Sequence, residues 1–422
     1  MLSSRAASTG RIGSTTRACR FCGQPLDRVV VDLGMSPLCE SFLREDQLDE
    51  MEPFYPLRVY ICDACLLVQL VDFVAPDEIF GEYAYFSSYS DSWLAHAEHF
   101  ARSMIDELAL ATDSMVVELG SNDGYLLRNF VRAGIPVLGI EPAANVASAA
   151  EAVGVDTLVR FFGADLGREL ADRGVQADLL VANNVLAQVP ALNDFLAGVK
   201  VLLKPDGLMT IEFPHLLRLL DGNQFDTIYH EHFSYFSLLS ARKILAAHGL
   251  SVVDVEELPT HGGSLRVHVR HDGLGASQAP AVNELEDRER LAGLDGPSGY
   301  SNLAARTEAA KRDVLAFLIA ARRDGRSVVG YGAPGKANTF LNYCGIRTDL
   351  VSYTVDRNPY KHGRFTPGTH IPIYAPEHIR ATRPDFVWIL PWNLRSEIAG
   401  QLEEVREWGG RLLVAIPRLE VF

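Results

Sequence analysis

Four side chains with acid–base chemistry stand together in one short segment. Residues 225–237 read FDTIYHEHFSYFS and include Tyr229, His230, Glu231 and His232. Histidine titrates near neutral pH, and a carboxylate can fix its tautomer and raise its basicity, while a tyrosine hydroxyl can donate to a carbonyl oxygen that becomes an enolate. These groups can cooperate only if the segment forms a turn or a helix start, because neighbours on a strand point to opposite sides. A metal site with an uncommon spacing and a hydrogen-bonded polar core are the other interpretations.

Four of the six cysteines form two CxxC pairs. Cys19 and Cys22 make one pair, and Cys62 and Cys65 make the other. Two thiolates three residues apart can bind one metal ion, and two such pairs supply a tetrahedral sulfur shell. Because no position is left for a water, we expect a structural Zn²⁺ ion, with two disulfides as the alternative. The other two cysteines, Cys39 and Cys344, are expected to be small buried residues.

A cofactor site is indicated after an apolar strand expected at 115–119. Gly120 follows that strand, and glycine lets the backbone pass close to a ligand at the carboxyl end of a strand. Glu141 ends the next expected strand, where an acid can accept both ribose hydroxyls of an adenosine. An adenine ring could stack near Phe161. The candidate cofactor-binding residues are Glu118, Gly120, Ser121, Asn122, Glu141, Phe161 and Asn183.

Strand and helix patterns alternate through this region, which predicts a parallel sheet covered by helices on both faces. The expected strands are 115–119, 136–140, 178–182 and 208–213, and the expected helices are 96–109, 124–133, 143–152 and 191–203. Residues 73–95 are expected to be a connector or loop, and residues 272–302 a loose connector. A long helix at 303–323 then leads into a second alternating unit. Its expected elements are strands at 327–331, 350–355, 386–390 and 411–415 and a helix at 335–343.

The second unit carries a glycine pattern of its own. Gly330, Gly332 and Gly335 match GxGxxG after a strand, and Asp356 ends the next strand. Alone, this pattern is a dinucleotide-binding fingerprint, so an NAD(P)-dependent oxidoreductase acting on a nucleotide sugar is the alternative function. Lys336 places a cation at the helix start, which suits any phosphate.

Composition limits the function classes. The chain has 422 residues, is 48% hydrophobic and carries a net charge of −15, so a broad nucleic-acid-binding surface is not expected. No apolar run reaches about 18 residues, so no membrane span is expected. The first 18 residues contain arginine, serine and threonine but no acid, and they are expected to form a disordered leader; a transit peptide is the alternative. The expected location is the cytoplasm.

The order of these features resembles the sugar C-methyltransferases of antibiotic deoxysugar biosynthesis, which are class I S-adenosylmethionine-dependent enzymes with an N-terminal zinc-binding domain. The resemblance rests on the CxxC pairs, the unit over roughly 110–250, the YHEHFSYFS segment and the Gly-Ala-x-x-Lys segment. It implies an α/β chain in four parts: a leader at 1–18, a zinc-binding domain at 19–80, a Rossmann-like methyltransferase domain at 81–255 and a Rossmann-like nucleotide-sugar-binding domain at 256–422. It also implies methyl transfer to a carbon of a dTDP-4-keto-deoxysugar, most commonly C-3′, with C-5′ as the alternative.

The same resemblance implies roles for single residues. His232 is expected to be the general base and Glu231 its partner, with Tyr229 and Tyr83 around the keto sugar. The expected substrate-binding residues are Lys336, Asn338, His261 and Gln188. Family members often have histidine where this chain has Gln188, which leaves only hydrogen bonding there. The expected partner is a nucleotide-linked keto-deoxysugar, with no nucleic acid or membrane, and the expected state is a monomer or weak homo-oligomer. A non-catalytic binding protein is a third function class, opposed by the Tyr-His-Glu-His cluster.

Overall fold

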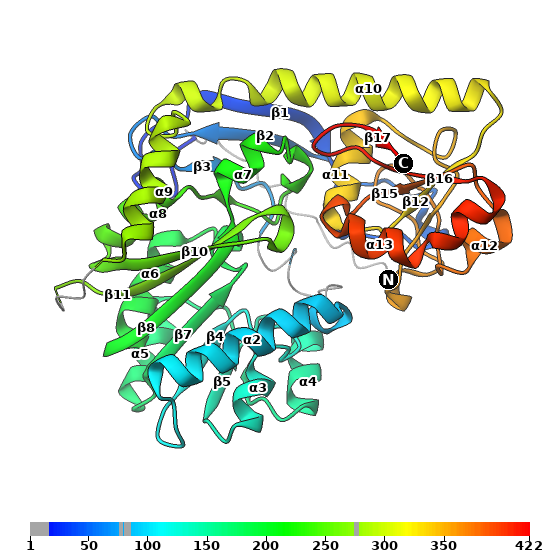
Figure 1. Cartoon of the computed structure of the whole chain (residues 1–422). Coiled ribbons are helices and arrows are strands. Elements are labelled where there is room, and N and C mark those ends of the chain that lie inside the picture. Colours follow the sequence, from blue (N-terminus) through cyan, green and yellow to red (C-terminus); the bar gives the residue numbers. More distant parts are fainter. Residues whose placement is uncertain (1–16, 76–78, 80–85, 274–277) are drawn as a thin grey trace, which may run out of the picture.

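The computed structural model describes residues 17–75, 79, 86–273 and 278–422, and within them the chain forms three β-sheets (Figure 1). The predicted disordered leader falls almost entirely outside these residues, and so does Tyr83. No helix in the described part of the chain is both long and apolar enough to cross a membrane.

The first sheet is built mainly from the N-terminal domain. Its order is β1-β2-β3-β9, and each neighbouring pair is antiparallel. The strands are β1 Arg28–Ser36, β2 Tyr55–Ile61, β3 Val68–Leu70 and β9 Ser234–Tyr235. The short strand β9 belongs to the YHEHFSYFS segment, and its Tyr235 pairs with Val68. The N-terminal sheet is therefore completed by the segment that carries the candidate base.

The second sheet has seven strands in the order β10-β11-β8-β7-β4-β5-β6. Strands β4 to β8 run parallel, and β10 and β11 close one edge antiparallel. The strands are β4 Val116–Leu119, β5 Val137–Ile140, β6 Thr157–Leu158, β7 Ala177–Asn183, β8 Leu203–Pro214, β10 Leu250–Leu258 and β11 Ser264–His271. The helices of this unit are α2 Asp91–Leu108, α3 Leu127–Arg132, α4 Ala144–Ala152, α5 Ala164–Asp172, α6 Leu192–Leu202, α7 Leu216–Asp221 and α8 Leu238–Ala247. The predicted parallel α/β unit is thereby confirmed.

The third sheet forms the C-terminal unit. Its order is β14-β13-β12-β15-β16-β17, with only the β16–β17 pair antiparallel. The strands are β12 Val328–Tyr331, β13 Thr354–Val355, β14 Ile373–Tyr374, β15 Phe386–Ile389, β16 Arg411–Val414 and β17 Glu420–Val421. The helices are α11 Gly335–Cys344, α12 His378–Thr382 and α13 Arg395–Gln401. This mostly parallel sheet confirms the second Rossmann-like unit.

The prediction of a loose connector at 272–302 is wrong, because helix α9 spans Pro280–Leu291. The apolar pattern is weak because a carboxylate occupies a core position: Glu289 is 0% exposed. Its oxygens accept the backbone N–H groups of Leu238 and Leu239, at 2.7 and 2.9 Å, where α8 begins. Because Glu289 is a buried acid in α9, it interrupts the apolar pattern from which that helix would be predicted.

Helix α2 starts earlier than predicted, at Asp91, within the segment expected to be a connector. The Ser90 hydroxyl accepts the Trp93 N–H at 3.3 Å, a helix-start contact that the aromatic and serine-rich composition concealed.

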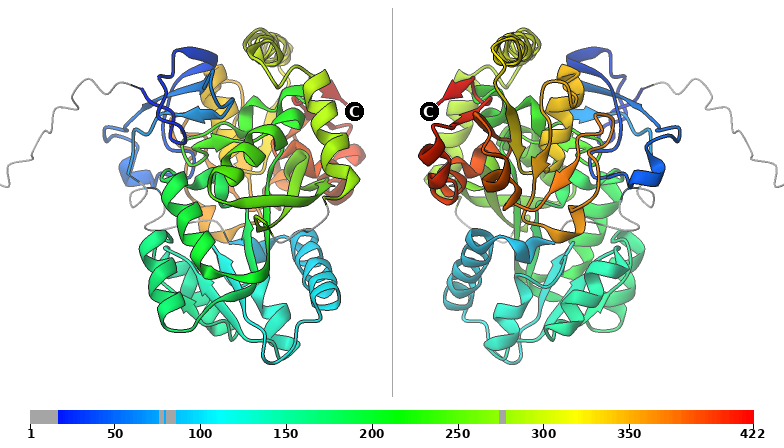
Figure 2. Two further views of the ribbon diagram at one scale, coloured as in Figure 1. Left: turned by 90° about the vertical axis from the view of Figure 1, so that its left-hand side faces the viewer. Right: turned by 90° about the vertical axis from the view of Figure 1, so that its right-hand side faces the viewer.

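The long helix α10 spans Leu303–Arg323, as predicted, and passes β1 on its way to the C-terminal unit (Figure 1). Figure 2 shows the N-terminal strands beside α11, and β1 contacts that helix. The N-terminal domain therefore packs against the C-terminal unit as well as against β9.

Candidate active site

One large cavity lies between the middle and C-terminal units. Its volume is about 930 Å³, at the upper end of the range of small-molecule pockets. The wall comes from the turns after β4, β5 and β7, from the 227–232 segment, and from the turns after β12 and β13. The N-terminal domain adds Glu40. These turns follow the carboxyl ends of parallel strands, where ligands bind in such sheets.

Five of the seven predicted cofactor residues line this cavity: Gly120, Asn122, Glu141, Phe161 and Asn183. Gly120 has φ +65°, and a Cβ there would lie 2.5 Å from a methyl group of Val185, so only glycine suits this turn. The Oδ1 atom of Asn183 is buried and has no hydrogen-bond partner among the described residues. An unsatisfied amide oxygen in the wall fits a polar ligand.

Glu141 holds the turn that follows β4. Its carboxylate accepts the N–H groups of Asn122 at 3.0 Å and Ala143 at 2.9 Å. Burial raises its pKa, and the two N–H groups lower it in part. The carboxylate therefore fixes the turn from within the cavity wall.

The other two predicted cofactor residues, Glu118 and Ser121, do not form part of the cavity wall. Both are 0% exposed. Burial raises the pKa of Glu118 well above its usual range. The Ser121 hydroxyl packs against Gly139, where a Cβ would come within 2.5 Å of it. Side chains along a strand and the turn that follows it point to different sides, and those of Glu118 and Ser121 point away from the cavity. The spacing of residues in the sequence does not distinguish the two sides.

The YHEHFSYFS segment begins with a turn. The His232 N–H donates to the Tyr229 carbonyl at 2.9 Å, and Tyr229, Glu231 and His232 all line the cavity. This geometry meets the condition set by the sequence for Glu231 and His232 to act together. His230 is outside the cavity wall: its Nε2 lies 3.2 Å from the Pro56 carbonyl oxygen and its ring packs on Tyr55.

The protonation of His232 follows from its hydrogen bond. Its Nδ1 lies 3.0 Å from the Thr227 carbonyl oxygen, which can only accept, so Nδ1 carries the proton and Nε2 keeps a lone pair. Burial lowers the pKa of His232 to about 4, assisted by the nearby His261 and Lys336, against the Thr227 bond. The Thr227 carbonyl therefore orients the ring of His232 through Nδ1, and the pairing of Glu231 with His232 stays a prediction.

The Glu231 carboxylate also contacts a residue of the N-terminal domain. Its Oε1 lies 3.4 Å from the Cys39 Sγ, and both side chains are buried. The position of Cys39 confirms that it is a small buried residue, but its place beside the cavity was not predicted. A single cysteine without a partner at ligand spacing gives no such signal.

His261 lies in the cavity wall with a backbone φ of +54°, a strained value for a residue with a side chain. Its ring lies 5.2 Å from that of Trp93, and its Nε2 lies 3.3 Å from the Asn184 amide. Burial lowers its pKa to about 4, and Lys336 contributes.

A buried ionic network behind this wall was missed. Glu212 at the end of β8 is 0% exposed, and its carboxylate contacts His96 at 3.1 Å, Thr260 at 2.9 Å and Arg266 at 3.2 Å. It thereby ties α2 to the loop that carries His261. An acid at the end of an apolar strand indicates such a site in the sequence. Glu118 and Glu141 were selected by this pattern, but Glu212 was not.

Lys336 of the C-terminal unit and Gln188, which follows β7 in the middle unit, both line the cavity. Lys336 Nζ donates to the Asn393 Oδ1 at 2.7 Å, and burial lowers its pKa. Asn338 does not reach the cavity: it is 1% exposed and donates to the Cys39 carbonyl at 2.5 Å. It sits one helical turn inside α11, behind the part of the helix that faces the ligand.

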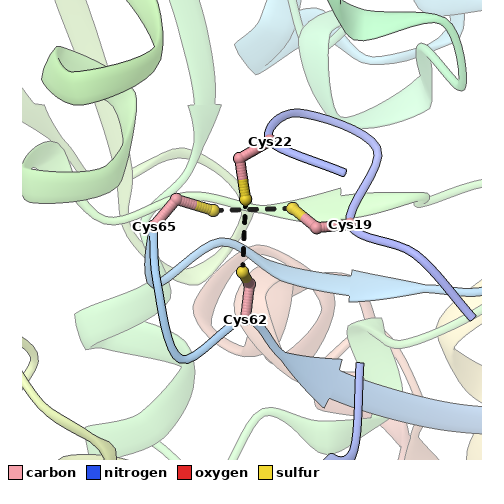
Figure 3. Close-up of side chains that lie close together, drawn as sticks. All are labelled: Cys19, Cys22, Cys62 and Cys65. Atoms are coloured by element: carbon pink, nitrogen blue, oxygen red, sulfur yellow. Dashed lines mark hydrogen bonds between the residues drawn. The ribbon is translucent and has the colours of Figure 1, made fainter. Parts of the chain in front are cut away.

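The four predicted metal ligands converge (Figure 3). The Sγ atoms of Cys19, Cys22, Cys62 and Cys65 all lie within 4.8 Å of one another. The two closest pairs are 3.5 Å apart, far beyond a disulfide bond. The Gln69 amide also donates to the Cys19 Sγ at 3.1 Å, as outer partners of metal ligands do. Four sulfurs in this arrangement fit one structural zinc ion.

The sheet order and this cavity together define a class I S-adenosylmethionine-dependent methyltransferase. Three family models match the chain: a proposed zinc binding domain at residues 19–80, a methyltransferase domain at 93–255 and a C-methyltransferase C-terminal domain at 259–417. The C-methyltransferase NovU of Streptomyces niveus is 38% identical over 403 residues, 96% of either chain. The chain therefore belongs to this family of S-adenosylmethionine-dependent C-methyltransferases, with a zinc-binding N-terminal domain.

Two solved structures are each similar to about half of the chain. Magnesium protoporphyrin IX methyltransferase from Synechocystis PCC 6803, with bound SAH, is 17% identical with a TM-score of 0.33, and covers 46% of this chain and 91% of its own. The 1,6-didemethyltoxoflavin-N1-methyltransferase of Burkholderia thailandensis is 18% identical with a TM-score of 0.35, and covers 51% and 95%.

Proposed function

We propose that the protein transfers a methyl group from S-adenosylmethionine to a carbon, C-3′, of a dTDP-4-keto-deoxysugar through a base-generated enolate, in antibiotic deoxysugar biosynthesis. The observation that carries the proposal is one turn that directs Tyr229, Glu231 and His232 into the cavity shared with Gly120 and Lys336. Similarity to NovU along nearly the whole chain supports it.

The residues proposed to hold the cofactor are Gly120, Asn122, Glu141 and Asn183, which line one end of the cavity. When bound there, S-adenosylmethionine supplies an electrophilic methyl group, so the protein has to supply positioning and proton removal. Lys336 lines the same cavity from the C-terminal unit and offers a cation to a diphosphate.

His232 is the proposed base. A C–H beside a ketone is weakly acidic, and Nε2 of His232 has the lone pair needed to accept the proton. Its lowered pKa keeps the imidazole neutral at pH 7, and the negative charge that forms on the enolate stabilises the imidazolium as it appears. The Tyr229 ring lies 4.1 Å from that of His232, and its hydroxyl is the proposed donor to the enolate oxygen. Glu231 lines the same cavity wall and is the proposed partner of His232.

Isotope exchange tests the base separately from methyl transfer. In deuterated water, the protein should exchange the C-3′ hydrogen of a dTDP-4-keto-deoxysugar, as read by NMR. His232→Asn should abolish this exchange and leave S-adenosylmethionine affinity unchanged. His230→Asn is the matched control, because His230 packs on Tyr55 outside the cavity wall. Unchanged exchange in His232→Asn would remove His232 from the mechanism, and exchange at C-5′ alone would move the reacting carbon.

A further inference from the structure

In the glycine-rich turn of the C-terminal unit, backbone groups of Gly332 and Ala333 are hydrogen-bonded to other residues of the protein. The Gly332 N–H donates to the Val355 carbonyl at 2.6 Å, and the Ala333 N–H donates to the Asp356 carboxylate at 2.7 Å. The Ala333 carbonyl accepts from the Lys361 ammonium at 2.8 Å. In a dinucleotide-binding unit this turn and the following helix start receive the pyrophosphate.

A carboxylate of the N-terminal domain occupies the space at the start of α11. The Glu40 Oε1 lies 3.3 Å from where a Cβ on Gly335 would be, and the Cys39 Sγ lies 2.8 Å from that point. The Cys39 carbonyl accepts the Asn338 amide from inside the same helix. Cys39 and Glu40 are thus fixed against the start of α11. They can lie this close only because residue 335 is a glycine.

The Glu40 carboxylate is held as a buried ion pair. Its Oε2 lies 3.4 Å from the Lys361 ammonium, and the two side chains are 16% and 8% exposed. Burial raises the pKa of Glu40, while Lys361 and the Gly335 N–H lower it in part. Burial lowers the pKa of Lys361, but Glu40 and Asp356 outweigh it and raise the pKa overall. Both groups are therefore stabilised in their charged forms by each other.

We propose that Glu40 is an internal anion that takes the place of a phosphate at the glycine-rich turn, and that it is a specificity-determining residue. An incoming pyrophosphate would meet the Glu40 carboxylate beside Gly335 at the helix start. The C-terminal unit therefore rejects nicotinamide dinucleotides although its sequence matches their fingerprint. Glu40 and Lys336 line the same cavity, so a diphosphate there is directed toward the Lys336 ammonium and away from the Glu40 carboxylate.

The test measures binding of inorganic pyrophosphate to the full-length, zinc-loaded protein by calorimetry, without sugar or S-adenosylmethionine. Glu40→Gln should bind pyrophosphate about tenfold more tightly than the natural chain, within the range that a helix start gives an anion. Glu45→Gln, an exposed acid of the same domain, should leave the affinity unchanged. Equal affinities of Glu40→Gln and the natural chain would overturn the proposal, and so would micromolar NADH binding by the natural chain.

A second measurement does not depend on how the variant folds. A crystal of the natural protein soaked in pyrophosphate should show no anion at the start of α11 and an unmoved Glu40–Lys361 pair. Pyrophosphate density against the Gly335 N–H, with Glu40 displaced, would contradict the inference. Both measurements are independent of which sugar the enzyme methylates.

Discussion

The two Rossmann-like units build the same turn from different residues. In the middle unit, the Gly120 N–H donates to the Ile140 carbonyl at 2.7 Å, and Glu141 binds two backbone N–H groups. In the C-terminal unit, Gly332 donates to Val355 at 2.6 Å, and Asp356 binds the N–H groups of Ala333 and Asn358 at 2.7 and 2.8 Å. A glycine and an acid at the end of the next strand thus fix the same backbone arrangement twice.

The units differ in what lies beyond the turn. Both turns line the cavity, the first through Gly120 and Asn122 and the second through Gly332 and Gly335, but among the described residues no segment of the N-terminal domain is seen against the first. After β12, Cys39 and Glu40 of the N-terminal domain lie against the start of α11. A glycine–acid pattern therefore predicts the shape of a turn, whereas its ligand depends on segments that are distant in sequence.

Loss of the metal should have the largest effect, and it should separate proton removal by the 227–232 segment from cofactor binding. Cys62→Ser removes a ligand from a site type that contributes about 10 kcal/mol or more to the folding of small zinc domains. We expect hydrogen–deuterium exchange at C-3′ to be lost, because β9 pairs with β3, while S-adenosylmethionine affinity stays within about threefold. Calorimetry measures the affinity, and Cys344→Ala, a buried cysteine outside the cluster, is the control. Equal loss of both functions would mean that the cofactor-binding turns depend on the metal too.

Matched glycine substitutions come next. Gly120→Ala should weaken S-adenosylmethionine binding by roughly a hundredfold, because the new methyl group meets Val185 in the cofactor end of the cavity. Gly332→Ala carries a similar strain, with φ +90° and a contact of 2.6 Å with Pro391. It should lower the free energy of unfolding by about 2–3 kcal/mol and leave cofactor affinity within about threefold. Calorimetry and urea denaturation check the pair, and the interpretation fails if Gly332→Ala weakens the cofactor as strongly.

The acids at the strand ends should show a smaller contrast. Glu141→Gln should weaken S-adenosylmethionine binding by about tenfold, because an amide oxygen accepts less strongly than a carboxylate and its NH₂ group faces a donor. Asp356→Asn perturbs the equivalent turn and should change cofactor affinity by less than about twofold. Equilibrium dialysis with labelled cofactor measures both affinities. Equal effects of the two substitutions would contradict the proposal that the middle unit alone binds the cofactor.

The last expected effect is on the pH dependence of stability. His232 and His261 have pKa values of about 4 in the folded chain, below the value of ~6.5 for unfolded histidine. The unfolded chain binds these protons first, so stability is complete above pH ~6.5 and declines as the pH falls toward 4. We expect roughly 1–2 kcal/mol from each histidine, less than full burial would give because both line the cavity. Urea denaturation at pH 7 and 5 should show a shallower loss in His261→Asn than in the natural chain, with exposed His99→Asn as the control.

Much of this architecture follows from local pattern. Strands of alternating or continuous apolar residues and the long helix at 303–323 were predicted near their observed positions, and the CxxC spacing located the metal cluster. The failures share a physical cause. Glu289 and Glu212 are charged residues in core positions, where their partners come from distant segments. Glu40 reaches the cavity, and Cys39 reaches Glu231, only through tertiary packing. Whether Ser121 points toward the cavity or away from it depends on the turn geometry.

The pairing of β9 with β3 has a consequence for the order of synthesis. The two CxxC pairs and strands β1 to β3 emerge from the ribosome long before Ser234 and Tyr235. These two residues of β9 pair with Gln69 and Val68 of β3. Until then β3 presents an open edge, a liability for mispairing that nascent chains must avoid. If residues 19–80 were expressed alone, the edge of β3 would stay unpaired. We therefore expect this fragment to aggregate and not to fold as an independent domain.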